Sequence, residues 1–360
     1  MKRASSRQPI EKLYILGAGS SYALSEIKSR GDKKFAASST PLDKDFLSRL
    51  VEFTPKNRGW QKRALDLIRD DWLDHRDLTK HGLEEAIIKR VGQYEMLVSL
   101  HQQKTRGKVN NPVYVNHLTH LITDYLLTCK SNNSGATKKF IDETFPKHTE
   151  AKDYRNRIIT FNYDTIIERP LLERNLSKKK IYFDRISSKP NTSRRRNADE
   201  VFPHPLILKL HGSANWRCTK ADFESIISGE IGSETKIDIW TDDKPCPNPN
   251  DEISPLIIPP IPNKPITGAK IFLDLWTTAY EYLHEAKEVI IIGYSCPTTD
   301  TLARTMFTHF EPNKLKRIVI ADPDTNALSR YRSLMIPKVA SSAKWEYFSN
   351  FSEFIQHEFK

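Results

Sequence analysis

Cysteine is scarce in this sequence of 360 residues, and no two cysteines form a close pair. The four cysteines are Cys129, Cys218, Cys246 and Cys296. Structural zinc sites and disulfide-rich folds use cysteines at short, repeated spacings such as Cys-x-x-Cys. The spacing here excludes a zinc ribbon of that kind and a disulfide framework. We therefore expect four reduced, isolated thiols and no bound metal.

Long apolar runs are also missing. No segment approaches the roughly 20 consecutive apolar residues that a membrane helix needs. Hydrophobic residues make up 38% of the chain and charged residues 28%, as in ordinary globular proteins. The first stretch, MKRASSRQPIEKLY, is charged and has no apolar core of the length found in signal peptides. We therefore expect a cytoplasmic protein that does not enter membranes.

Positive charge is in excess, with a formal net charge of +11. Part of it gathers in residues 177–180 (SKKK) and 187–197 (SSKPNTSRRRN). A basic surface can meet nucleic acid or an acidic protein partner. However, no aromatic residues alternate with the arginines of 187–197, as they do on many surfaces that stack bases. A solvated basic loop and a binding surface both stay open.

Five short segments are rich in β-branched and apolar residues, and each ends in small or polar residues. Strands that are apolar throughout are buried on both faces, which is typical of a parallel sheet. Helical patterns follow the last two segments, at 301–310 and 326–335. This alternation predicts an α/β fold with a Rossmann-like parallel sheet flanked by helices. The five predicted strands are 13–16, 157–161, 206–210, 288–293 and 317–321.

Two ranges differ from the predicted strands in composition and in the spacing of their apolar residues. Within 47–150, apolar residues recur at three- and four-residue spacing, which predicts a helical insertion. The range 221–266 contains the Pro- and Asn-rich stretch 241–265, and we expect an irregular insertion there, of a length that often lines sites. We expect one domain over residues 1–360 that carries both insertions.

Glycines and polar residues directly follow each predicted strand. In an open parallel sheet, ligands bind beyond the carboxyl ends of the strands. Because these ends meet at one edge of the sheet, the residues that follow them are expected to form one site. They are Gly17, Ala18, Gly19 and Ser20 after the first strand, then Asn162, Asp164, His211, Gly293, Ser295 and Asp322.

Several of these residues have a plainer interpretation beside the functional one. The turn GAGSSY can bring a phosphate to backbone N–H groups at a helix start, but Tyr22 replaces the third glycine of the usual dinucleotide fingerprint, so it fits a simple strand–helix turn equally. Asp164 can hold a ribose hydroxyl or cap the next helix. Asp300 or Thr299 is expected to cap the helix that follows. Asp322 suits an adenosine hydroxyl or a turn.

His211 ends the strand LILKL and precedes Gly212-Ser213. An imidazole titrates near neutrality and can accept a proton from a sugar hydroxyl or from water. The alternative is a buried histidine whose hydrogen bonds are satisfied and which only closes the strand. Its place among the other strand-end residues favours a role in the site.

Four motifs occur in order along the chain: GAGSS (17–21), TFNYD (160–164), KLHGSANW (209–216) and GYSCPTTD (293–300). With them the sequence resembles the sirtuin superfamily, and specifically its SIR2-like branch found in bacterial antiphage defence proteins. Residues 40–46 (TPLDKDF) also resemble that branch's loop after the glycine turn. The resemblance implies a Rossmann-like domain that binds NAD+.

The resemblance also implies a role for each residue of the predicted site. Asn162 and His211 would be the catalytic pair, with His211 as the catalytic histidine. Asp164 would line the nicotinamide–ribose pocket beside Asn162. The remaining contacts to the dinucleotide would come from Gly17, Ala18, Gly19 and Ser20 around the pyrophosphate, Gly293 and Ser295 at ribose and phosphate, and Asp322 near the adenosine.

The protein deacetylases of that superfamily carry a zinc ribbon, which this sequence lacks. Without it an acyl-lysine tunnel is not expected, and water remains as the acceptor. We therefore expect an NAD+ glycohydrolase that forms nicotinamide and ADP-ribose and depletes NAD+ in antiphage defence. The alternatives are an NAD-dependent deacylase or ADP-ribosyltransferase, and a non-catalytic sensor of NAD+ or ADP-ribose.

An enzyme that destroys NAD+ has to be controlled, and the sequence contains no evident sensor domain. We therefore expect control by assembly into a homo-oligomer or by a partner protein. The resemblance implies a HerA-like ATPase or a short Argonaute as that partner. Nucleic acid would then be met through the partner or through the basic loop 187–197.

Overall fold

The computed structural model describes most of the chain outside 26–39, 63–111 (Leu83 excepted) and 183–204. The basic loop 187–197 and much of the range 47–150 lie outside the described residues. The described residues are 9–25, 40–52, 59–62, 83, 112–130, 135–147, 149, 153–182, 205–228, 235–240, 246–259, 269–298, 300–312, 314–335 and 337–360.

A six-stranded parallel sheet forms the centre of the protein. Its order is β3-β2-β1-β7-β8-β9, and every neighbouring pair is parallel. The chain builds outward from β1 first to one side and then to the other, which is the doubly wound Rossmann order. The strands are β1 (Lys12–Leu16), β2 (Arg157–Thr160), β3 (Ile207–Lys209), β7 (Glu288–Ile292), β8 (Arg317–Ala321) and β9 (Lys344–Phe348).

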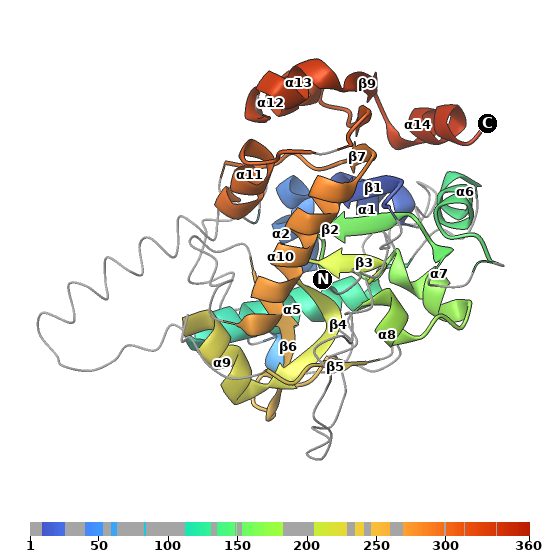
Figure 1. Cartoon of the computed structure of the whole chain (residues 1–360). Helices are drawn as coiled ribbons and strands as arrows, with labels where there is room; N and C mark the ends of the chain where they lie inside the picture. Colours follow the sequence, from blue (N-terminus) through green and yellow to red (C-terminus); the bar gives the residue numbers. More distant parts are fainter. Residues whose placement is uncertain are drawn as a thin grey trace, which may run out of the picture.

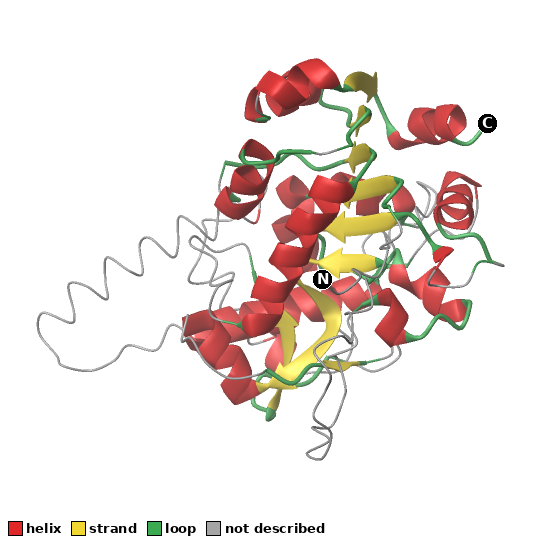
Figure 2. Ribbon diagram, viewed as in Figure 1, coloured by secondary structure: helices red, strands yellow, loops and turns green. Residues whose placement is uncertain are grey.

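Helices cover both faces of this sheet (Figures 1 and 2). In Figure 1, α11, α12 and α13 lie on one side of the stacked strands and α6, α7 and α14 on the other. Strands β1, β2, β7 and β8 are almost entirely buried, as expected for strands covered on both faces. The predicted Rossmann-like α/β fold is therefore confirmed. These helices are α6 (Gly135–Thr144), α7 (Glu168–Glu173), α11 (Thr301–Thr308), α12 (Ala327–Leu334), α13 (Pro337–Ser342) and α14 (Phe351–Glu358).

Helix α10 (Lys270–Glu285) packs against the parallel sheet at β3. It buries an apolar face whose residues recur at three- and four-residue spacing, including Phe272, Leu275 and Trp276, which is the pattern of an amphipathic helix on a core. Further helices are α1 (Ala18–Leu24), α2 (Asp43–Glu52), α5 (Pro112–Thr128), α8 (Lys178–Ile181) and α9 (Lys220–Ser228).

A second, antiparallel sheet of three strands follows β3 and was not expected from the sequence. Its order is β5-β4-β6, with β4 (Gly212–Thr219), β5 (Asp238–Ile239) and β6 (Ile253–Ile257). The range 221–266, in which we expected an irregular insertion, thus contains β5, β6 and most of α9. The start of β4 depends on Gly212, which has φ +82 and where a Cβ would lie 2.2 Å from the Leu256 carbonyl oxygen. Only glycine accommodates both conditions.

All four cysteines are free and buried. Among the residues that the structure describes, no helix combines the length and the apolar composition needed to cross a membrane.

Arg317 is the centre of an ionic network at the amino ends of the strands. Its guanidinium contacts Glu288 on β7 at 3.0 Å, Glu346 on β9 at 2.6 Å and Glu358 on α14 at 2.9 Å. Lys12 on β1 also contacts Glu358, at 2.5 Å. Burial opposes ionisation of Glu358, but the hydrogen bonds from Arg317 and Lys12 lower its pKa. The network fastens α14 to four strands, at the edge of the sheet opposite the predicted site.

We predict that Arg317→Met lowers the free energy of unfolding by about 2 kcal/mol, because it leaves three neighbouring carboxylates without their shared cation. Urea unfolding at pH 7 measures this difference. The pKa of Glu346 and that of Glu358 are lowered. The stabilisation of the fold by the ion pairs of Arg317 is therefore complete above the usual glutamate pKa of 4.5. It disappears as the pH falls through the lowered values.

Lys344→Met is the matched control, because Lys344 pairs with Glu346 while three quarters of its side chain is exposed. That pair is expected to contribute less than about 1 kcal/mol. Equal destabilisation by both substitutions would contradict a special role for Arg317.

Candidate functional site

A cavity of about 480 Å³ opens at the carboxyl ends of β1, β2, β3 and β7. It lies where the strand order reverses, between β1 and β7, which is the place where doubly wound folds bind ligands. Nine of the ten residues predicted for the site line this cavity: Gly17, Ala18, Gly19, Asn162, Asp164, His211, Gly293, Ser295 and Asp322. The tenth, Ser20, is buried, and its hydroxyl donates to the Gly17 carbonyl oxygen at 2.7 Å.

The glycine turn after β1 packs directly against the loop after β7. The Gly17 N–H donates to the Ile292 carbonyl oxygen at 3.1 Å, and the Gly19 N–H donates to the Gly293 carbonyl oxygen at 3.0 Å. A Cβ on Gly17 would lie 2.5 Å from the Gly293 oxygen, and one on Gly293 would lie 2.4 Å from the Ser20 nitrogen. Gly293 also has φ +57. The glycines therefore let two backbones meet, and α1 begins directly after the turn at Ala18.

Asn162 holds this glycine turn from the neighbouring strand. Its amide nitrogen donates to the Gly17 carbonyl oxygen at 2.7 Å and to the Ser21 hydroxyl at 2.7 Å. These two hydrogen bonds fix the plane of the amide at the edge of the cavity. The side-chain oxygen is then the atom of Asn162 suited to accept a hydrogen bond from a ligand.

Asp164 follows Asn162 by two residues and is buried. Its carboxylate accepts the Ile166 N–H at 3.1 Å, so it orders the turn before α7 while it lines the cavity. Lys209, the one charged residue of the strand LILKL, donates to the Asp164 carbonyl oxygen and pairs with Glu168 at 2.8 Å. Burial raises the pKa of Glu168, and Lys209 opposes that shift. The buried pair fixes the loop that carries Asp164.

His211 lies in a cluster of aromatic rings and is 4% exposed. Its ring centroid is 5.5 Å from that of Phe161, 6.3 Å from that of Tyr163 and 6.1 Å from that of Trp276. Trp276 on α10 also donates its indole N–H to the Leu210 carbonyl oxygen at 3.2 Å. The rings and the backbone contacts hold the imidazole at the cavity, and His211 and Asn162 line the same space.

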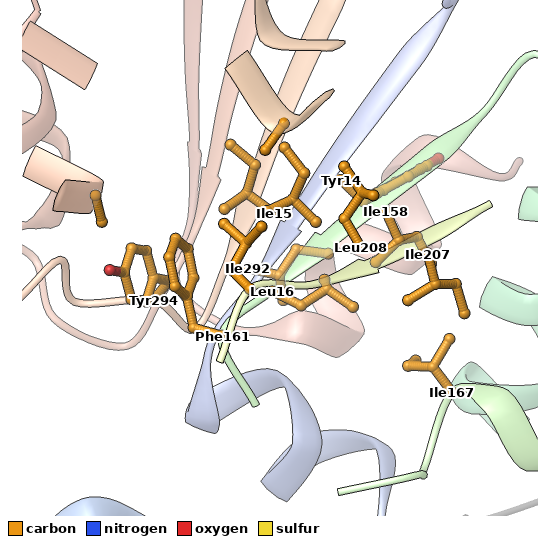
Figure 3. Packing of buried hydrophobic residues seen from close by; sticks show 14 of the residues in the cluster. Tyr14, Ile15, Leu16, Ile158, Phe161, Ile167, Ile207, Leu208, Ile292 and Tyr294 are labelled. Carbon is orange, nitrogen blue, oxygen red and sulfur yellow. The ribbon is translucent and has the colours of Figure 1, made fainter. Parts of the chain in front are cut away.

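The loop after β7 contributes two residues that the sequence patterns did not identify as part of the site. Tyr294 stacks on Phe161, with ring centroids 4.0 Å apart and planes at 9° (Figure 3). Its hydroxyl donates to Asp300 Oδ2 at 2.9 Å, and burial raises its pKa well above the usual value. The same Asp300 oxygen lies 3.8 Å from His211 Nε2. We expected Asp300 to cap a helix. An aspartate at a predicted helix start does not by itself indicate a contact with His211.

The two remaining predicted residues lie at the β8 side and at the rim. Asp322 follows β8, and its carboxylate accepts the Asp324 N–H at 2.8 Å, so it orders its own turn as well as lining the cavity. Burial raises the pKa of Asp322. Ser295 is exposed at the mouth. Both are placed to meet a ligand that extends from β2 past β7 to β8.

The segment 40–46 closes another side of the cavity, next to two buried leucines. Its sequence resembles a family loop, but none of its residues was predicted to belong to the site. The additional lining residues from this side are Thr40, Pro41, Leu42, Asp43, Lys44, Phe46, Leu83 and Leu126. Within the described part of the chain, no group of three or more His, Cys, Asp or Glu side chains is arranged to hold a metal ion.

No protein-family model matches this chain, and no curated protein matches it. Solved structures similar to it include a sirtuin described in terms of its substrate affinity (13% identity, TM-score 0.37, 97% of this chain and 92% of that chain). A Sir2 homologue mutant in complex with ADP-ribose (10%, 0.38, 98% and 91%) and Sir2Tm bound to a propionylated peptide (12%, 0.36, 97% and 92%) are also similar. With TM-scores below 0.5, these similarities leave the fold and the site to be judged from the geometry of this chain.

We predict that Gly293→Ala lowers the free energy of unfolding by about 2 kcal/mol or more. The new methyl group would meet the Ser20 nitrogen and strain a residue at positive φ. Urea unfolding measures this difference. Gly59→Ala is the control, since a Cβ there meets nothing within 4 Å. An unchanged free energy of unfolding in Gly293→Ala would contradict the close contact of the two loops.

Proposed function

We propose that this protein is an NAD+ glycohydrolase that cleaves NAD+ to nicotinamide and ADP-ribose. The observation that carries the proposal is that the glycine turn, Asn162 and His211 line the same cavity, where the strand order reverses between β1 and β7. A helix start with a glycine turn suits a pyrophosphate. An amide and an imidazole in the same space suit a sugar and its leaving group. The volume of about 480 Å³ is within the usual range of ligand pockets.

Each lining group has a task in this reaction. The backbone around Gly17, Ala18 and Gly19 would receive the pyrophosphate, and Ser295 and Asp322 would meet the adenosine half. The side-chain oxygen of Asn162 would accept a hydrogen bond from the attacking water or from the nicotinamide amide. His211 would accept a proton from the water or from a ribose hydroxyl. The aromatic rings around His211 would exclude bulk water from the reacting carbon.

The reaction replaces one bond to the anomeric carbon by another. The bond between nicotinamide N1 and ribose C1′ breaks, and its electron pair leaves with nicotinamide. The ribose passes through an oxocarbenium-like state, as in glycoside hydrolysis. The oxygen of water then bonds to C1′, and the proton it loses passes to His211. The products are nicotinamide, ADP-ribose and one proton.

We predict that His211→Ala lowers the rate of nicotinamide release roughly 10²- to 10⁴-fold, because general base catalysis contributes about that factor. Nicotinamide formed from NAD+ is measured by chromatography, with any activating partner present. The matched control is His309→Ala, which removes an exposed histidine after α11, and it is expected to act like the wild type. Equal rates for His211→Ala and wild type would contradict the role of His211.

The acceptor is tested with NAD+ labelled in its adenosine half. Hydrolysis predicts that all label appears in free ADP-ribose. Label on a protein would instead indicate an ADP-ribosyltransferase, and consumption that depends on an acylated peptide would indicate a deacylase. Binding of NAD+ in calorimetry without any nicotinamide would indicate a sensor and contradict an enzyme.

We further propose a role in antiphage defence through NAD+ depletion, with activity controlled by self-assembly or by a partner protein. The need for control follows from the reaction, since uncontrolled loss of NAD+ would harm the cell that makes the enzyme. The partner classes are those implied by the sequence resemblance, a HerA-like ATPase or a short Argonaute. Light scattering of the purified chain tests self-association, and a monomer at micromolar concentration would speak against it.

A further inference from the structure

Asp300 occupies the start of a helix, yet its carboxylate is not used there. Aspartate is among the best N-cap residues because its side chain can accept the free N–H groups of the first turn. At the N-cap of α11, Asp300 makes no such side-chain hydrogen bond. The residue is also 4% exposed, although burying a carboxylate is costly unless other groups compensate it. The carboxylate therefore has another task.

Its contacts indicate what that task is. Oδ2 accepts the Tyr294 hydroxyl at 2.9 Å and lies 3.8 Å from Nε2 of His211. Tyr294 is in turn fixed by its stack on Phe161 and by the Tyr331 hydroxyl, which donates to the Tyr294 carbonyl oxygen at 2.6 Å. The Asp300 oxygen that faces His211 is thus held in place by a buried tyrosine. Asp300 and His211 both line the cavity.

We propose that Asp300 is a positioning residue for His211, with the Tyr294 hydroxyl holding its carboxylate. This inference rests on the proposed function, in which His211 accepts a proton. The acquired positive charge would lie among three uncharged rings, Phe161, Tyr163 and Trp276. A carboxylate at one ring nitrogen stabilises the imidazolium and orients the ring, as in other acid–histidine pairs.

The separation of 3.8 Å is longer than a hydrogen bond. Hydrogen bonds between catalytic groups are often long without substrate and shorten in the complex. Once His211 has accepted the proton, the opposite charges attract even at this distance, and burial strengthens that attraction. A small movement of either side chain would complete the hydrogen bond while the Tyr294 hydroxyl keeps its contact.

The test compares Asp300→Asn with the wild type. Asparagine keeps the shape and an oxygen for the Tyr294 hydroxyl but removes the charge. We expect kcat for nicotinamide release to fall roughly 10²- to 10⁴-fold, with KM changed less than about threefold and the urea midpoint unchanged. Asp300→Glu is expected to recover part of kcat. Asp238→Asn, an exposed aspartate on β5, serves as control and keeps full activity.

A double variant separates action through His211 from other effects. If Asp300 acts through His211, Asp300→Asn adds no further loss of kcat to His211→Ala, because residues that act as a unit are not additive. Losses that multiply in the double variant would overturn the proposal. So would an Asp300→Asn protein with wild-type kcat, or one whose only change is in KM.

A spectroscopic measurement tests the Asp300–His211 pair independently of the proposed enzymatic activity. The ring ¹H–¹⁵N signals of His211 are identified in NMR spectra by their absence in His211→Ala. Asp300→Asn is expected to shift these signals even in a protein that releases no nicotinamide. Absence of nicotinamide with a clear shift would reject the enzyme and keep the Asp300–His211 pair. Unchanged His211 signals would reject the pair.

Discussion

The close contact between Gly17, Gly19 and Gly293 is the constraint on which the site depends. Two backbone hydrogen bonds join the loop after β1 to the loop after β7, and side chains at these positions would collide with backbone atoms. The contact lies where the strand order reverses, so it joins the two halves of the doubly wound sheet. It also places the start of α1 at the cavity.

The other side of the cavity is fixed by polar groups that are buried and paired. Asn162 reaches across to the glycine turn, and Lys209 holds the loop of Asp164 together with Glu168. Aromatic rings surround His211, so electrostatic interactions there are stronger than in water. Segments far apart in the sequence therefore meet as one preorganised site, in which a single imidazole is oriented by its neighbours.

Much of the fold could be predicted from the sequence, and nine of the ten residues predicted for the site line the cavity. The buried part of a strand covered on both faces, for example residues 289–292 (VIII) of β7, is uniformly apolar, and its carboxyl end identifies the site edge. Strand β4 was missed because its buried residues GSANWRCT are mostly polar or small. Helix α14 was missed although Asn350 accepts the Glu353 N–H at 2.9 Å, a capping signal visible in the sequence. The Asp300–His211 contact depends on tertiary packing, which no local pattern contains.

The central claim is that one dinucleotide spans the glycine turn and the Asn162–His211 pair. The most direct measurement is a crystal structure of the protein with ADP-ribose. We expect the pyrophosphate at the backbone of residues 17–19, with the distal ribose between Asn162 and His211 and the adenosine toward Asp322. A pyrophosphate bound elsewhere, or a distal ribose in contact with neither Asn162 nor His211, would contradict the account.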